Sequence, residues 1–118
     1  MKIYKGVRTR TDLTVRVHEG SDFRPLTLTP AARLKSPTGF EWGYVGAGPA
    51  ALSLSILTDA LGRAAKAETL WGQFMDQVVS KLAHDQWELS IKAVLDWATA
   101  QVMKQERPAP HRAPASCN

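Results

Sequence analysis

Residues 44–57, YVGAGPAALSLSIL, mark the point at which this 118-residue chain changes from alternating to helical patterning. A glycine-rich turn at 46–48 leads into Pro49 and an apolar run, which predicts a helix over 49–61 that stops at Gly62. Apolar residues surround much of the circumference of this helix, so we expect burial on more than one side. The stretch therefore predicts that a helical second half packs on the segments before it.

The first half of the chain alternates between apolar and polar residues. Residues 2–8 and 13–17 have a period of two with β-branched side chains, which predicts strands joined by a short polar connection. Residues 23–28 predict a third extended piece, restricted to an edge or a loop by Pro25. Residues 40–45, FEWGYV, predict a further strand. Its aromatic side chains would share one face: Phe40, Trp42 and Tyr44. We expect this face to enter the core, and the alternative is an exposed platform on which bases stack.

Two more helices are expected after Gly62. One covers 64–82, and the other starts at the capping residue Ser90 and ends near Lys104. Residues 86–89 between them predict a short extended piece. The fold class is therefore α+β, with a small N-terminal antiparallel sheet of three or four strands packed against about three C-terminal helices. We expect one domain over 1–105 and a disordered, proline-rich tail over 106–118.

The composition excludes several classes of protein. Hydrophobic residues make up 44% of the chain, which is enough for one modest core. The single cysteine, Cys117, allows no disulfide within one chain and no cysteine-based metal site. No apolar run approaches the roughly 20 residues that span a bilayer, and the N-terminus does not have the pattern of a signal peptide. We expect no membrane association and a location in a reducing cytoplasm.

The letters of a dinucleotide-binding fingerprint occur at Gly46-x-Gly48-x-x-Ala51. In that fingerprint the glycines follow a buried apolar strand, and a second parallel strand ends at an acidic residue. Here the preceding segment is aromatic and half polar, and residues 63–69 are strong helix formers. We expect a strand-to-helix turn and no bound dinucleotide. An anion site at the helix N-terminus stays open at this stage.

The chain carries no recognisable catalytic or metal-binding pattern. Its three histidines are far apart in the sequence, and no Walker loop, nucleophile elbow or His-Glu-x-x-His helix occurs. The helical carboxylates are scattered over polar faces, which predicts that they are solvated: Asp59, Asp76 and Asp96. We therefore expect no enzyme, no cofactor and no metal.

The net charge of +4 is concentrated near the N-terminus, where residues 1–36 hold eight basic and three acidic residues. One interpretation is a solvated, mildly basic sheet surface. The other is a surface that contacts phosphate. In that second case the contacts would come from six residues: Arg8, Arg10, Arg16, Arg24, Arg33 and Lys35.

Two features suggest contacts with protein. Trp71 lies beside Leu70 on the second predicted helix, and we expect it to be partly exposed, which makes it a candidate anchor for a partner. The helix over 49–61 is apolar enough to face a second subunit in part, so a homodimer is one open arrangement.

Three stretches resemble a known family: KIYKGVR at 2–8, SPTGFEWGYVGAGPAALSLSILTDALG at 36–62, and FMDQVVSKLAHDQWELSIKAVLDW at 74–97. They are similar to a family of small uncharacterised proteins encoded in bacterial, phage and plasmid genomes. The resemblance spans about residues 1–97 and transfers no catalytic residue. It implies an accessory protein of a mobile element in the bacterial cytoplasm. Gly-Ala-Gly-Pro at 46–49 replaces the family's usual Gly-Ser-Gly-Pro, which removes a hydroxyl and weakens the anion-site hypothesis.

Two hypotheses of function follow. The first is a non-catalytic accessory protein of a phage or plasmid that binds a host protein, for example as an inhibitor of host defence. The alternative is a nucleic-acid-binding protein that uses the basic N-terminal sheet. The second predicts binding that weakens steeply with salt, because neutralised phosphates release counterions.

Overall fold

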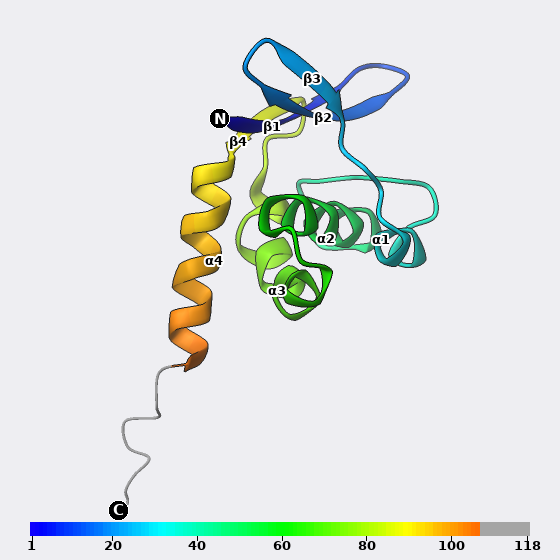
Figure 1. Ribbon diagram of the computed structural model, residues 1–118. Coiled ribbons are helices and arrows are strands. Elements are labelled where there is room, and N and C mark those ends of the chain that lie inside the picture. Colours follow the sequence, from blue (N-terminus) through cyan, green and yellow to red (C-terminus); the bar gives the residue numbers. More distant parts are fainter. Residues whose placement is uncertain (107–118) are drawn as a thin grey trace, which may run out of the picture.

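A computed structural model of the chain describes residues 1–106, except for the side chains of residues 105 and 106. A sheet forms one layer, and helices lie beneath it (Figure 1). The elements in chain order are β1 (Lys2–Arg8), β2 (Leu13–Glu19), β3 (Asp22–Pro25), α1 (Pro30–Lys35), α2 (Ala47–Leu61), α3 (Ala64–Gln77), a single 3₁₀ turn (Val79–Lys81), β4 (Gln86–Ser90) and α4 (Ile91–Glu106). The predicted α+β fold class is confirmed.

The four strands form an antiparallel sheet in the order β3-β2-β1-β4. Side chains alternate between the two faces of a strand, so the register assigns each residue to one face. Tyr4 lies opposite Val17 and Leu89, and all three point toward the helices. The side chains between them point away from the helices, so the sheet has an inner and an outer face.

Helix α2 is the centre of the helical layer and contacts α1, α3 and α4. All of its residues from Gly48 to Leu57 are buried. The expectation of burial on several sides is therefore confirmed. The helix ends where Gly62 adopts a left-handed conformation with φ 68°, as the sequence predicts. Because neighbours within the same chain bury α2, its apolar character no longer requires a second subunit.

The prediction of a strand at residues 40–45 is wrong. This segment is a loop, in which Gly39 and Gly43 adopt φ angles of 109° and 88° that break extended structure. The indole of Trp42 is buried and donates to the carbonyl of His84 at 3.0 Å. Tyr44, in contrast, is half exposed. The fourth strand is β4, which lies where the sequence predicted only a short extended piece.

The other boundaries differ little from expectation. Helix α2 begins two residues earlier, at Ala47, and α3 ends at Gln77 because the chain continues as the 3₁₀ turn instead of an α-helix to residue 82. Ser90 caps α4 as predicted, since its Oγ accepts from the backbone N–H of Ala93 at 3.1 Å. Helix α4 runs to Glu106. Residues 107–118, the rest of the predicted tail, lie outside the described residues.

Candidate interaction surface: the outer face of the sheet

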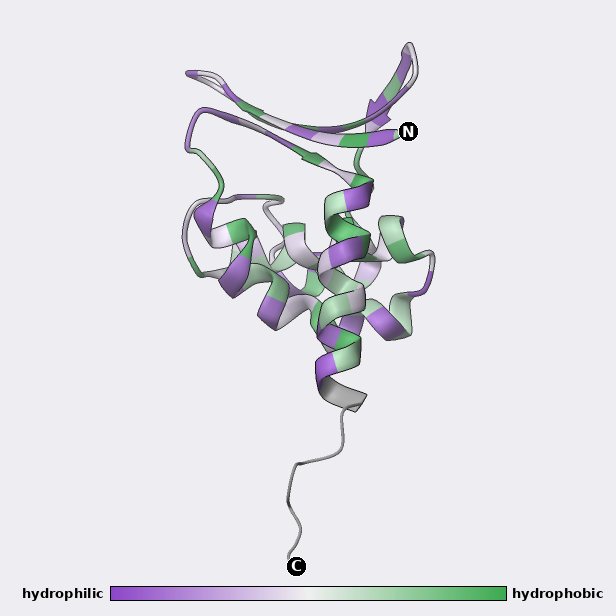
Figure 2. Ribbon diagram, turned by 90° about the vertical axis from the view of Figure 1, so that its left-hand side faces the viewer, coloured by the Kyte–Doolittle hydropathy of each residue, from purple (hydrophilic) through white to green (hydrophobic). Residues whose placement is uncertain are grey.

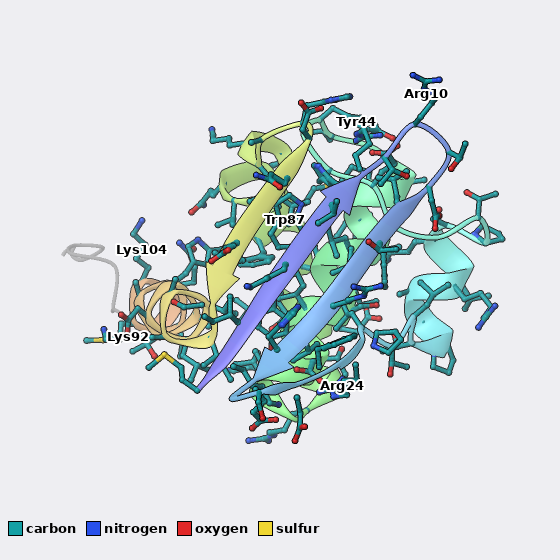
Figure 3. The ribbon with its side chains drawn as sticks, turned by 90° about the horizontal axis from the view of Figure 1, so that it is seen from above. Arg10, Arg24, Tyr44, Trp87, Lys92 and Lys104 are labelled. Carbon is teal, nitrogen blue, oxygen red and sulfur yellow. The ribbon has the colours of Figure 1, made fainter. Side chains whose placement is uncertain are left out.

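The outer face of the sheet is open to solvent along all four strands. Figure 3 shows this face from above, with α1, α2 and α3 behind the strands. Two apolar side chains on it are well exposed, Val7 at 41% and Phe23 at 59%. The register places the following residues on this face: Ile3, Lys5, Val7, Thr14, Arg16, His18, Phe23, Gln86 and Glu88. We call this set the open face.

An aromatic cluster lies at the β2–β3 side of the open face. The rings of His18 and Phe23 stack with centroids 5.4 Å apart, and the guanidinium carbon of Arg16 lies 5.1 Å from the Phe23 centroid. Cross-strand pairing of His18 with Phe23 across the turn at Gly20 sets this geometry. An exposed aromatic ring is thereby placed next to a cation.

The centre of the open face carries two like charges directly opposite each other. Lys5 on β1 pairs in register with Arg16 on β2, and the other neighbour of Lys5 is Glu88 on β4, at 3.6 Å. Like charges opposite each other across strands are destabilising. Glu88 contacts Lys5 but lies two strands away from Arg16, so the centre of this face has an excess of positive charge.

A shallow hollow of about 400 Å³ adjoins this charged centre between β1 and β4. Its lining residues are Lys5, Gly6, Val7, Gln86, Trp87 and Glu88. Gly6 contributes no side chain, and the Trp87 indole packs on the inner side, against Trp42. The open face is therefore uneven, with room for a protruding side chain of a partner.

Two of the six predicted phosphate contacts point inward and bind carboxylates. Arg24 donates to Asp59 of α2 at 2.7 Å, and Tyr4 donates to the same carboxylate at 2.7 Å. Lys2 lies 3.4 Å from it. The prediction that Asp59 is solvated is wrong, because three groups of the sheet surround it. Burial, and then the hydrogen bond to Asp59, raises the pKa of Tyr4 well above its ordinary value.

Arg8 forms the second inward cluster. Its guanidinium donates to both carboxylate oxygens of Glu41, at 2.8 and 3.1 Å, and lies over the ring of Trp42. These hydrogen bonds hold the pKa of Glu41 below its ordinary value. Such a two-point pair fixes the loop before α2 to the end of β1. Arg8 and Arg24 therefore connect the two layers of the fold.

The remaining predicted contacts lie on three separate parts of the surface. Arg16 is on the open face, Arg10 is at the tip of the β1–β2 hairpin (Figure 3), and Arg33 and Lys35 are on α1. Among the described side chains, none of these four forms an ion pair. The structure thus does not gather the six residues into one surface.

Trp71, the candidate protein contact, lies beside Lys35 of α1. The Nζ of Lys35 lies 4.0 Å from the centre of its ring, and the rest of the ring packs half-buried against the core. The role of Trp71 as an anchor stays a prediction. On the open face, Phe23 exposes more apolar surface.

Glu41 packs against the first turn of α2. Gly48 lies so close to Glu41 that a Cβ added to the glycine would be 2.6 Å from the Glu41 Cβ. The carboxylate itself is bound elsewhere, because both of its oxygens accept from Arg8 and one also accepts from the backbone N–H of Trp42. None of the described side chains caps the N-terminus of α2, and an anion site there stays an untested hypothesis.

We expect Gly48→Ala to lower the free energy of unfolding by about 1–2 kcal/mol, because overpacking against Glu41 outweighs the gain in helix propensity. Gly46→Ala is the matched control, since its Cβ would meet only the Tyr44 ring, which is half exposed and free to move. Chemical denaturation of both variants measures the difference. Equal midpoints for Gly48→Ala and the wild type would contradict the close packing.

Among the side chains that the structure describes, those of residues 1–104, no group of three or more His, Cys, Asp or Glu is placed to hold a metal ion. None of the helices described here has the length and apolar character needed to cross a bilayer.

The fold and the open face define a small two-layer α+β protein whose sheet is covered on one side. The chain belongs to a family of unknown function, DUF6166, which matches residues 4–100. The resemblance found in the sequence to an uncharacterised family is confirmed to this extent. No curated protein and no solved structure matches the chain.

Proposed function

We propose that this protein is a non-catalytic accessory protein of a bacterial mobile element, and that it acts by binding a host protein through the open face. A bacterial defence factor is one class of target that this proposal includes. Its site of action would be the cytoplasm of the bacterial host. The observation that carries the proposal is a sheet face left uncovered although it exposes Phe23 and Val7. An exposed aromatic ring beside an arginine, as Phe23 is beside Arg16, is a combination enriched at protein-binding sites.

The charges of the open face indicate the chemistry of the partner. Lys5 and Arg16 face each other, and Glu88 contacts Lys5 but lies two strands away from Arg16. An acidic group on the partner would relieve the repulsion between the two cations. We therefore expect a partner surface that combines an apolar side chain, placed against Phe23, with carboxylates placed near Arg16.

A tagged pull-down from a bacterial host lysate tests the proposal, run with and without nuclease at low and raised salt. The wild type should retain a host protein in stoichiometric amount after nuclease treatment. We expect Phe23→Ser and Arg16→Glu each to weaken this complex by about 30-fold, as for a central interface residue. Titration of the purified partner measures the change.

Two surface variants on α1 serve as matched controls. Leu34→Ser changes an apolar residue that is 87% exposed, and Arg33→Glu reverses an equally unpaired charge. Both should bind the partner like the wild type. Loss of binding in these variants, or full binding by Phe23→Ser, would rule out the open face as the interface.

Single-stranded nucleic acid is the second candidate ligand, because the Phe23 ring stacks on the imidazole of His18 and lies beside the Arg16 cation. Bases stack on such rings, and the backbone follows the positive charge. Only Arg16 of the six predicted phosphate contacts lies on this face, so we rank protein binding first. Nucleic acid that is recovered at low salt and lost at raised salt would reverse this order.

A further inference from the structure

An apolar groove lies away from the open face, where α4 passes α2 and α3. It has a volume of about 220 Å³, and apolar side chains provide most of its lining: Leu61, Lys66, Leu70, Leu95, Ala98, Thr99, Val102 and Met103. Leu95 and Met103 are 37% and 66% exposed. Figures 1 and 2 show that α4 extends past α3 at its C-terminal end. The groove is therefore open on the side that α4 presents to solvent.

The solvent-facing stripe of α4 beside this groove is symmetrical about Thr99. Lys92, Leu95, Thr99 and Met103 follow one another at intervals of three, four and four residues, which places them on one side of a helix. Leu95 and Met103 are each four residues from Thr99. When two such helices cross in antiparallel orientation at Thr99, Leu95 of each copy lies opposite Met103 of the other.

Size and charge also suit this antiparallel arrangement. Thr99 is small and exposed, so two helices can approach closely at the crossing point. Lys92 of one copy, which pairs with Asp96 of its own helix at 2.7 Å, would lie beside the C-terminal end of α4 of the other copy. A cation is favourable near a helix C-terminus, where the backbone carbonyls carry partial negative charge. Both ends of the contact would have this charge complementarity, because the arrangement is two-fold.

We propose that the protein forms a two-fold homodimer in which the α4 helices pack antiparallel across Thr99, and in which Met103 of each copy enters the groove of the other. The contact is isologous, so it closes at two subunits. Because α4 descends on the inner side of the sheet, the open face stays free in both copies. The dimer is therefore independent of the proposed function and would present two open faces.

Sedimentation equilibrium of the full chain over a wide concentration range is the first test. One helix pair, about 24 Å long, is smaller than a standard interface of about 800 Å² per partner. We therefore expect a monomer–dimer equilibrium with a dissociation constant on the order of 10 μM. A monomer at every concentration, from well below to well above this value, overturns the proposal.

Two substitutions that introduce a negative charge test where the dimer contact lies. Met103→Glu should weaken the dimer by at least about tenfold, because it places a carboxylate in the partner's apolar groove. Leu34→Glu makes the same change at an exposed position of α1 and should leave the dimer unchanged. The thermal midpoints of both variants should match the wild type at low concentration, since both side chains are exposed. A dimer that persists in Met103→Glu contradicts the proposal.

Disulfide trapping tests the register. In a Cys117→Ser background, Thr99→Cys should give a covalent dimer on mild oxidation, because the two cysteines meet at the two-fold axis. Ala93→Cys, also exposed on α4, should remain monomeric. Equal trapping of both variants contradicts the register. Dimerisation that appears only after removal of residues 107–118 would assign the groove to the chain's own C-terminal segment and overturn the proposal.

Discussion

Gly6→Ala is expected to lower the free energy of unfolding by about 3 kcal/mol, because the inner side of β1 has no room for a methyl group at this position. A Cβ at Gly6 would lie 2.3 Å from both Cε2 and Nε1 of Trp87, which is the residue opposite it on β4. Trp87 cannot retreat, since its ring packs edge to face against the buried Trp42. Urea denaturation followed by circular dichroism measures the loss.

Gly72→Ala is a control with the opposite expected sign. Gly72 lies within α3, and nothing is within 4 Å of a Cβ built on it. Alanine there should raise the free energy of unfolding by about 0.5–1 kcal/mol through helix propensity. Gly6→Ala should cost much less in a Trp87→Leu background, because the clash is with the indole. Additive effects in the double variant would show that the indole is not the cause.

The sequence allowed the main layers of this fold to be predicted, because those layers follow from local patterns. Alternation in residues 2–8 and 13–17 identifies β1 and β2, and the inner positions Val15 and Val17 are the buried ones. The all-round apolar character of α2 correctly indicated its central place. These signals depend only on which neighbours along the chain are apolar.

The fourth strand could not be assigned from local patterns. FEWGYV contains more strand-forming residues than QWELS, yet QWELS pairs with β1, some 80 residues away along the chain. Gly39 and Gly43 argue against a strand, because their left-handed φ angles interrupt the extended backbone. The aromatic side chains of this segment therefore do not line one face of a strand. Tertiary context therefore overrode the higher local strand propensity of FEWGYV.

The candidate site was missed for a related reason. The alternation of β2 predicts that Arg16 and His18 point away from the core, and a two-residue turn at Gly20-Ser21 would place Phe23 opposite His18. The sequence-based prediction ended the second strand at residue 17 and began the third extended piece at residue 23. It therefore placed residues 18–22 in a turn and missed this pairing. The inward ion pairs of Arg8 and Arg24 depend on carboxylates 33 and 35 residues away, and no local pattern indicates them.

Asp59→Ala is expected to lower the free energy of unfolding by about 3 kcal/mol. The change would leave the hydroxyl of Tyr4, a fully buried residue, without its acceptor, at a cost of about 1–3 kcal/mol. Arg24 and Lys2 would lose their carboxylate at the same time, although solvent screening makes each of these exposed contacts worth less. Asp59→Asn should cost less, because the amide oxygen can still accept from Tyr4.

The contribution of Asp59 should also depend on pH. Burial alone would raise the pKa of Asp59, but hydrogen bonds from Arg24 and Tyr4 and the charges of Arg24 and Lys2 outweigh it and hold the pKa below the ordinary value of 3.8. A carboxyl whose pKa is lower in the folded state stabilises the fold above its unfolded pKa, and this stabilisation is lost as the pH falls through the folded pKa. The stability gap between wild type and Asp59→Asn should therefore be constant near neutral pH and narrow below about pH 4. Asp96→Asn, which removes only an exposed contact with Lys92, should change stability by no more than about 0.5 kcal/mol at any pH. If the difference in stability between wild type and Asp59→Asn stays constant as the pH falls below about 4, the charge of Asp59 does not stabilise the contact between the sheet and the helices.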